Sequence, residues 1–197
     1  MRTAGIVLAA GASQRMGRPK ALLCGPDGVP LAAQQAEVLR RGGCNWVAVV
    51  VGSEAERVRS GLPGGLATVE NPRWAQGRAT SLQTGAGAFP EADGVLFLPV
   101  DAVGVKPTTI RALLAAAETN PSHVWRPVHN GVTGHVLWVP RVWVAELQRL
   151  PEDARVDEWA KPLAQELDVD DPAILRNVNT PQDWEELTKE SGDGAAT

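Results

Sequence analysis

The chain has 197 residues, 44% of them hydrophobic, which is enough for one α/β domain with a full core and short for two. Its formal net charge is -4, and this mildly acidic balance argues against nucleic-acid binding, although a small anionic ligand needs only local positive charge. No apolar run approaches the length of a membrane span, and the apolar start suits a buried strand better than a signal peptide. Cys24 and Cys44 are expected to be free thiols, as in a reducing compartment. We therefore expect a cytoplasmic protein with no membrane or nucleic-acid partner.

Short apolar runs alternate with helical stretches through the first half of the chain. Buried strands are expected at residues 4–8, 46–51, 67–69 and 94–100. Helices are expected at 31–41, directly after Ser53 as a cap, at 79–88 and at 107–119. This alternation is typical of a parallel sheet covered by helices on both faces.

The second half of the chain departs from this alternation. Asn130-Gly131 lies between two apolar runs within residues 123–139 and predicts a β-hairpin. Helices are expected at 141–150 and 156–167, a strand at 174–178, and a last helix that begins at Thr180-Pro181. The predicted fold is a three-layer, Rossmann-like α/β fold, whose mostly parallel sheet has helices on both faces and an inserted β-hairpin. We expect one domain over residues 1–190 and a disordered tail over 191–197.

The segment after the first strand has the composition of a phosphate-binding loop. Residues 9–12 (Ala-Ala-Gly-Ala) are small, so a ligand can approach the backbone, and exposed N–H groups in such a loop form an anion-binding nest. Arg15 adds a guanidinium fork and Lys20 a point charge. The segment is neither a P-loop nor a dinucleotide fingerprint. Taken alone, it could also be a flexible surface loop with scattered basic residues.

Asp101 follows the apolar run at 94–100, at the carboxyl end of a predicted central strand. In open parallel sheets this edge is where ligands bind, and the Gly11 loop lies at the same edge. Mg²⁺ prefers one or two carboxylates together with phosphate oxygens and water. Asp101 is therefore a candidate for holding a metal that bridges phosphates, with a turn or helix-capping role as the alternative.

A longer string around the loop resembles the signature of the molybdenum cofactor nucleotidyltransferases, within the wider group of NTP transferases. The family pattern LAAGxSxRMGxPKxLL stands here as LAAGASQRMGRPKALL at residues 8–23. The resemblance implies that this loop holds a triphosphate and that Arg15 and Lys20 are catalytic. The positions that it places against the nucleotide are Leu8, Ala9, Ala10, Gly11, Ser13 and Gly17.

Other segments extend the resemblance. Residues 71–77 (NPRWAQG), followed by Ser81-Leu82, are similar to the family's N-P-x-W-x-x-G-x-x-x-S-L segment, which implies that Gly77 and Ser81 lie against the nucleotide. Gly134-His135 resembles a hairpin pair near the acceptor, which implies an acceptor-binding role for His135. The family also places its metal-binding aspartate where Asp101 stands, although the short polar residue and proline that commonly follow are absent here. Core packing for Trp74 and a structural or surface role for His135 remain open.

The late segment Asn177-Val178-Asn179-Thr180-Pro181 bears on the metal and on the base. Cytidylyl-type members commonly carry Asp-x-Asp-Thr-Pro at this place, whereas guanylyl-type members can carry the Asn form. The resemblance therefore implies Asp101 and Asn179 as the metal ligands and Mg²⁺ as the cofactor. The remaining motifs are cytidylyl-type, so CTP is favoured over GTP.

The resemblance implies transfer of a nucleoside monophosphate from an NTP to a molybdopterin-type cofactor, with release of pyrophosphate. A transient contact with an enzyme that accepts the finished cofactor is also expected. Three alternatives stay open: a guanylyltransferase that uses GTP on the same acceptor, a sugar-phosphate nucleotidyltransferase, and a binding module that has lost the chemistry. The Asn pair keeps the last alternative open, and the retained Arg15, Lys20 and Asp101 argue against it.

Overall fold

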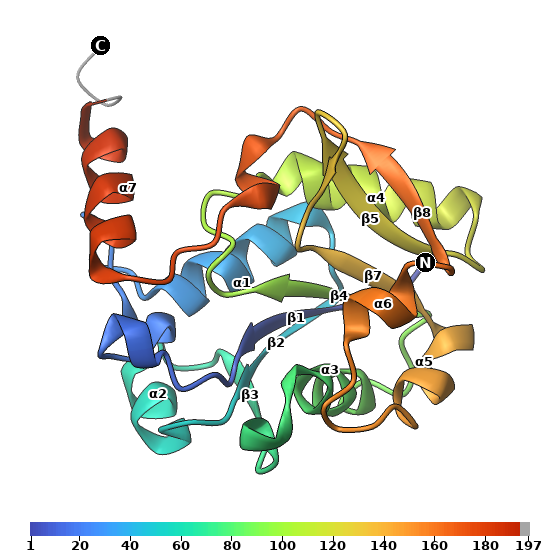
Figure 1. The fold of residues 1–197 in the computed structure, drawn as a ribbon, viewed down its shortest axis with the longest axis horizontal. Coiled ribbons are helices and arrows are strands. Elements are labelled where there is room, and N and C mark those ends of the chain that lie inside the picture. The colour runs from blue at the N-terminus through green and yellow to red at the C-terminus, as the bar shows by residue number, and fades with distance from the viewer. Residues whose placement is uncertain (194–197) are drawn as a thin grey trace.

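A mixed β-sheet organises the computed structural model, which describes residues 1–193, without the side chains of residues 190–193 (Figure 1). Within these residues the strands are β1 (Thr3–Ala9), β2 (Trp46–Val51), β3 (Ala67–Glu70), β4 (Gly94–Pro99), β5 (Val124–His129), β6 (Val132–Thr133), β7 (Leu137–Pro140) and β8 (Ala164–Asp168). Their order is β3-β2-β1-β4-β7-β5-β6, and β8 pairs with β5. Strands β1 to β4 are mutually parallel, and β7 joins antiparallel to β4.

Helices cover both faces of this sheet (Figure 1). They are α1 (Leu31–Gly42), α2 (Ala55–Gly61), α3 (Arg78–Gly87), α4 (Pro107–Thr119), α5 (Arg141–Leu147), α6 (Val156–Ala160) and α7 (Pro181–Asp193), with short 3-10 turns η1 (Gln14–Met16), η2 (Lys20–Leu22), η3 (Trp74–Gln76) and η4 (Pro172–Leu175). Among the described residues, no helix combines the length and the apolar character that crossing a bilayer requires.

Side-chain alternation along β1 divides the core into two layers. Val7 packs with α1 and α4, whereas its neighbour Ile6 packs with α3 and α5 on the opposite face. Both side chains are fully buried, as expected for a central strand of a parallel sheet. The predicted three-layer, Rossmann-like fold with a mostly parallel sheet is confirmed. The hairpin is also confirmed: β5 and β6 pair antiparallel around Asn130 and Gly131, which both have positive φ.

The prediction of one helix over residues 156–167 is wrong. Helix α6 ends at Ala160, and Ala164–Asp168 forms β8, which pairs parallel with β5. Pro162 lacks the backbone N–H that a continuing helix would use, and the open edge of β5 offers the following residues a ladder instead. This partner is distant in sequence, so local periodicity does not reveal it.

Two further expectations differ from the structure. The strand expected at 174–178 is replaced by the turn η4, where the buried Asp171 accepts a hydrogen bond from the Ala173 N–H at 3.2 Å. Ser53 is not the cap of α2, because the helix starts after Glu54 without a side-chain capping bond. Helix α7 extends to Asp193, and residues 194–197 of the expected tail lie outside the described residues, so the tail stays a prediction.

Candidate functional site

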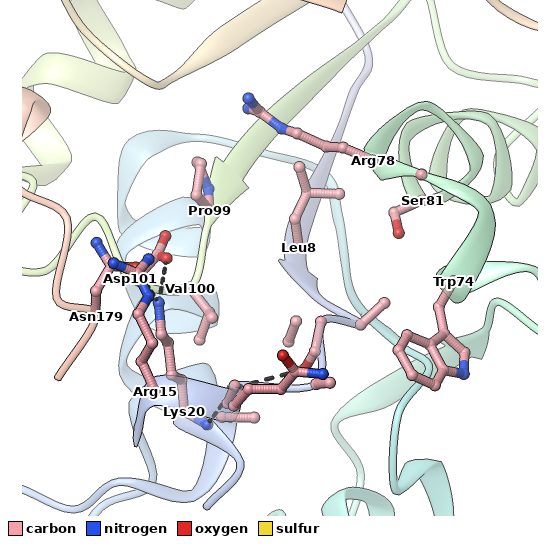
Figure 2. A pocket seen from close by; sticks show the side chains of 18 residues that line it. Leu8, Arg15, Lys20, Trp74, Arg78, Ser81, Pro99, Val100, Asp101 and Asn179 are labelled. Carbon is pink, nitrogen blue, oxygen red and sulfur yellow. Dashed lines mark hydrogen bonds and ion pairs between the residues drawn. The ribbon is translucent and has the colours of Figure 1, made fainter. Parts of the chain in front are cut away.

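A cavity of about 620 Å³ lies at the carboxyl ends of β1 and β4 (Figure 2). Its wall comes from the loop after β1, from the η2 turn, from η3 and the start of α3, from the end of β4 and from Asn179 just before α7. Small-molecule sites usually occupy about 300–1,000 Å³. The cavity is therefore large enough for a nucleotide, and it lies at the sheet edge where open α/β folds bind their ligands.

The loop after β1 is folded so that its backbone faces this cavity. Ser13 has a left-handed conformation with φ 51°, and its hydroxyl oxygen accepts a hydrogen bond from the Lys20 N–H at 3.2 Å. Its carbonyl accepts hydrogen bonds from Met16 and Gly17, which closes the η1 turn. Within the described residues, the N–H groups of Gly11 and Ala12 donate no hydrogen bond. These donors are available to an anion, as in other backbone nests.

Lys20 joins the loop to the end of β4. Its Nζ donates to Asp101 Oδ2 at 2.7 Å and to Asn179 Oδ1 at 2.9 Å. The Lys20 side chain is only 11% exposed and that of Asp101 is 24% exposed, so the pair is partly shielded from water. Figure 2 shows Arg15 beside Lys20, with its side chain directed toward Asp101 and Asn179. The cluster therefore concentrates positive charge at one side of the cavity.

Asp101 and Asn179 form the oxygen donor set that a divalent cation would need. Both oxygens lie within hydrogen-bond distance of a single Lys20 nitrogen, so one cation can contact both of them. Mg²⁺ binds oxygen ligands and usually keeps several waters and substrate phosphate oxygens. No group of three or more His, Cys, Asp and Glu side chains suited to a metal occurs in residues 1–193. The donor set therefore fits a metal that arrives with phosphate oxygens rather than one held in an all-protein cage.

A capping box at the start of α7 fixes Asn179. Asp183 Oδ2 accepts hydrogen bonds from the N–H groups of Asn179 at 2.7 Å and Thr180 at 2.9 Å, and the Asp183 N–H donates to Thr180 Oγ1 at 3.2 Å. The bonds from Asn179 and Thr180, together with the nearby charge of Arg15, hold the pKa of Asp183 below its ordinary value. The carboxylate is therefore ionised at neutral pH and keeps the Asn179 backbone in place.

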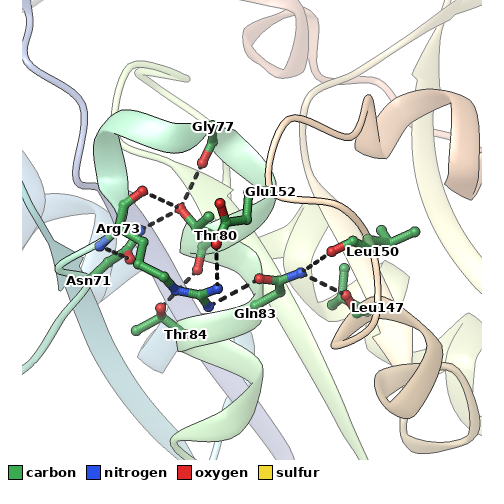
Figure 3. Close-up of polar contacts among 9 residues, drawn as sticks. All are labelled: Asn71, Arg73, Gly77, Thr80, Gln83, Thr84, Leu147, Leu150 and Glu152. Atoms are coloured by element: carbon green, nitrogen blue, oxygen red, sulfur yellow. Dashed lines mark hydrogen bonds and ion pairs between the residues drawn. The ribbon is translucent and has the colours of Figure 1, made fainter.

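The opposite wall is organised by Asn71, which is completely buried (Figure 3). Asn71 Nδ2 donates to Thr80 Oγ1 at 2.8 Å and to Ser81 Oγ at 3.0 Å, and Asn71 Oδ1 accepts the Arg73 N–H at 3.0 Å. Thr80 Oγ1 in turn donates to the Gly77 carbonyl at 2.7 Å. This network ties the turn at residues 71–77 to α3 and fixes Ser81 in the cavity wall.

The backbone conformation and a close contact require glycine at position 77, and the sequence motif does not reveal this requirement. The φ of Gly77 is 148°, in the region that favours glycine, and a Cβ there would collide with the carbonyl oxygen of Glu152. The resemblance implies only that Gly77 lies against the nucleotide. The structure places Gly77 in the cavity wall and also in close contact with the backbone of the segment before α6.

Most of the residues expected at the site do lie together in the cavity wall. They are Leu8, Ala9, Ala10, Gly11, Ser13, Arg15, Lys20, Gly77, Ser81, Asp101 and Asn179. Gly17 lies outside the wall and ends the η1 turn with φ 72°. His135 also lies outside the wall, and its N–H donates to the Ile174 carbonyl at 3.1 Å. Their expected contacts with nucleotide and acceptor stay predictions.

Trp74 and Arg78 are wall residues with large side chains that were not assigned a site role from the sequence. Trp74 packs against the core on the α3 side and also lines the cavity, so core packing and a site role are both compatible with its position. Arg78, the first residue of α3, reaches over the cavity near Leu8 and Pro99 (Figure 2). A single exposed arginine at a helix start carries no distinguishing signal in the sequence.

A loop with free backbone N–H groups after the first strand, a lysine that follows it and a carboxylate after a neighbouring strand lie together at one edge of the sheet. The chain belongs to the MobA-like NTP transferase domain family, whose model matches residues 5–169. It is therefore an enzyme of the nucleotidyltransferase type that resembles molybdenum cofactor guanylyltransferases.

Individual relatives and solved structures are also similar to the chain. The chain is 30% identical over 206 residues to a probable molybdenum cofactor guanylyltransferase of Synechococcus elongatus, covering 95% of this chain and 98% of that protein. It is 38% identical over 116 residues to nicotine blue oxidoreductase of Paenarthrobacter nicotinovorans, but that match spans 57% of this chain and only 55% of that relative. Among solved structures, Rv0371c from Mycobacterium tuberculosis matches with TM-score 0.80 at 25% identity, over 96% of this chain and 99% of that one. A complex of Rv0371c with manganese has the same fold, at TM-score 0.75 and 24% identity, over 96% of this chain and 99% of that one.

Proposed function

We propose that this enzyme transfers a nucleoside monophosphate from CTP to the phosphate of a molybdopterin-type cofactor, in a Mg²⁺-dependent reaction that releases pyrophosphate. One observation carries the proposal: Lys20 from the loop meets Asp101 and Asn179 at the edge of a nucleotide-sized cavity. The free thiols Cys24 and Cys44 suit a reducing compartment, and we propose the cytoplasm as the place of the reaction.

The chemistry needs no nucleophile from the protein. An oxygen of the acceptor phosphate attacks the α-phosphorus of the nucleotide and forms a new P–O bond. The bond from the α-phosphorus to the bridging oxygen breaks, and its electron pair leaves with pyrophosphate. Catalysis is then positioning together with stabilisation of the developing negative charge.

The chain's own residues divide this work. Backbone N–H groups of Gly11 and Ala12 and the cations Arg15 and Lys20 bind the β and γ phosphates and neutralise the departing pyrophosphate. Asp101 and Asn179 would hold Mg²⁺, which supplies charge neutralisation at the phosphates when it is bound. Lys20 contacts both oxygens, so its ammonium would turn toward the phosphates if Asp101 and Asn179 held a metal.

GTP is the second candidate donor, and it is favoured by the late Asn motif and by the name of a relative. Asn177 and Asn179 match the late motif that guanylyl-type members can carry. A relative that matches 95% of the chain is named a probable molybdenum cofactor guanylyltransferase. The loop string, the segment at residues 71–77 and Gly134-His135 support CTP.

A pyrophosphate-release assay tests the proposal. Purified enzyme is incubated with Mg²⁺, molybdopterin-type cofactor and either CTP or GTP, and the nucleotide-linked product is identified by mass spectrometry. We expect release with one nucleotide and loss of activity with EDTA. The same assay compares the Lys20→Ala variant with Arg18→Ala. Arg18→Ala is the matched control, because Arg18 is an exposed cation of the same loop outside the cavity wall. No release with either nucleotide would contradict the proposal.

A further inference from the structure

Two arginines from distant parts of the chain share one carboxylate beside the cavity. Asp157, near the start of α6, accepts from Arg78 Nη1 at 3.3 Å through Oδ2 and from Arg126 Nη2 at 3.0 Å through Oδ1. Arg78 begins α3 and Arg126 lies on β5. The three side chains together carry one net positive charge, and Glu166 is the register partner of Arg126 on β8.

Arg126 is held more tightly than an ordinary surface arginine. Its side chain is only 14% exposed, and Nη2 also donates to the Gly134 carbonyl at 3.2 Å. Its Nε is buried and has no hydrogen-bond partner among the described residues. Buried polar groups are normally paired, because an unpaired one costs about 1–3 kcal/mol. Arg126 therefore keeps donor capacity that Asp157 and the Gly134 carbonyl do not use.

Asp157 holds Arg78 only weakly. Its side chain is 56% exposed, and Arg78 is 45% exposed, so water screens their ion pair. A phosphate dianion carries more charge than this carboxylate and matches the guanidinium fork in a bidentate way. Such a ligand can therefore displace Asp157 from the arginines.

The position of Arg78 connects this group with the proposed reaction. Arg78 lines the same cavity as Lys20, and Figure 2 shows it across Leu8 from Arg15 and Lys20. If Arg15 and Lys20 receive the departing pyrophosphate, the attacking phosphate must approach the α-phosphorus from another side of the cavity. Arg78 stands at such a side.

We propose that Arg78 and Arg126 bind the phosphate monoester of the acceptor, and that Asp157 is a counterion that this phosphate displaces. The inference rests on the proposed function for its place in the reaction. The existence of an anion site at these two arginines is independent of which nucleotide is the donor.

Calorimetric titration of phenyl phosphate, a simple phosphate monoester, and of inorganic phosphate tests the proposal. All variants are made in a Lys20→Ala background, which weakens phosphate binding at the loop after β1. We expect Arg126→Gln to raise the Kd for phenyl phosphate at least tenfold. Asp157→Asn removes the competing carboxylate while keeping its size, so we expect it to lower the Kd at least threefold.

Several outcomes would overturn the proposal. An unchanged Kd in Arg126→Gln, or weaker binding in Asp157→Asn, would mean that the three residues form only a structural ion-pair group. Binding of inorganic phosphate without phenyl phosphate would exclude an acceptor site. If Arg126→Gln does not fold, the Asp157→Asn titration decides alone, because a structural role predicts no gain in affinity.

Nucleotide binding separates this inference from the proposed function. In the otherwise wild-type enzyme, we expect Arg126→Gln to change the Kd for Mg·CTP or Mg·GTP less than twofold, because Arg126 is outside the cavity wall. If the wild-type enzyme binds neither nucleotide but binds phenyl phosphate through Arg126, the proposed function fails and the anion site stands. If nucleotides bind and Arg126→Gln does not change the Kd for phenyl phosphate, the anion site fails and the proposed function stands.

Discussion

Replacing Asn71 with alanine tests whether the buried amide network supports the cavity wall. The substitution removes three hydrogen bonds, to Thr80, to Ser81 and from the Arg73 N–H, at a side chain that is 0% exposed. At about 1 kcal/mol for each net hydrogen bond, the expected loss in the free energy of unfolding is about 3 kcal/mol. For a chain of this size, the melting temperature should fall by roughly 6–12 °C.

Calorimetry or urea unfolding of the wild-type and variant enzymes measures this loss. Asn45→Ala is the matched control, because Asn45 is exposed and accepts a single hydrogen bond from the Thr3 N–H at 2.8 Å. We expect the control to lose about 1 kcal/mol or less. Asn71→Ala should also weaken nucleotide binding, since Ser81 lines the cavity. Equal losses in Asn71→Ala and Asn45→Ala would refute the reasoning.

Three further predictions concern charged and sulfur groups. Lys20→Ala and Asp101→Ala should each reduce turnover on the order of a hundredfold or more, as the loss of a preorganised electrostatic group does, and a near-normal rate would remove that residue from the mechanism. Burial raises the pKa of the Cys44 thiol to about 12, so iodoacetamide at pH 8 should modify the exposed Cys24 and spare Cys44 until urea is added; mass spectrometry that finds both alkylated in the native enzyme would contradict this. The lowered pKa of Asp183 adds stability above its unfolded-state pKa that is lost as the pH falls through the folded-state pKa, so Asp183→Asn should be less destabilised by acid than wild type in unfolding curves below pH 4, and parallel curves would count against it.

The parts of the fold that were predicted correctly carry their signals locally. The apolar run of β2 is flanked by polar residues and glycine, and α4 begins at Pro107 as its sequence indicated. The strand β8 was missed because its formation depends on the edge of β5, about forty residues earlier in the chain. Local periodicity cannot report a partner at that distance.

The candidate site likewise contains residues that local sequence signals predict and residues that depend on distant parts of the chain. The loop at residues 9–12, Lys20 and Asp101 could be placed together, because each follows a strand whose carboxyl end lies at one edge of the sheet. The contact among Arg78, Arg126 and Asp157 could not be predicted from the sequence, because these residues come from three elements and form no contiguous motif. The collision that requires glycine at position 77 likewise depends on a distant carbonyl group.

A crystal structure of the enzyme with Mg²⁺ and a non-hydrolysable analogue of CTP or GTP is the most direct test of the central claim. The account predicts the triphosphate against the N–H groups of Gly11 and Ala12, with Lys20 in contact with a phosphate oxygen and the metal at Asp101. A nucleotide bound elsewhere, or a triphosphate that leaves the Lys20–Asp101 ion pair intact and contacts neither residue, would contradict it.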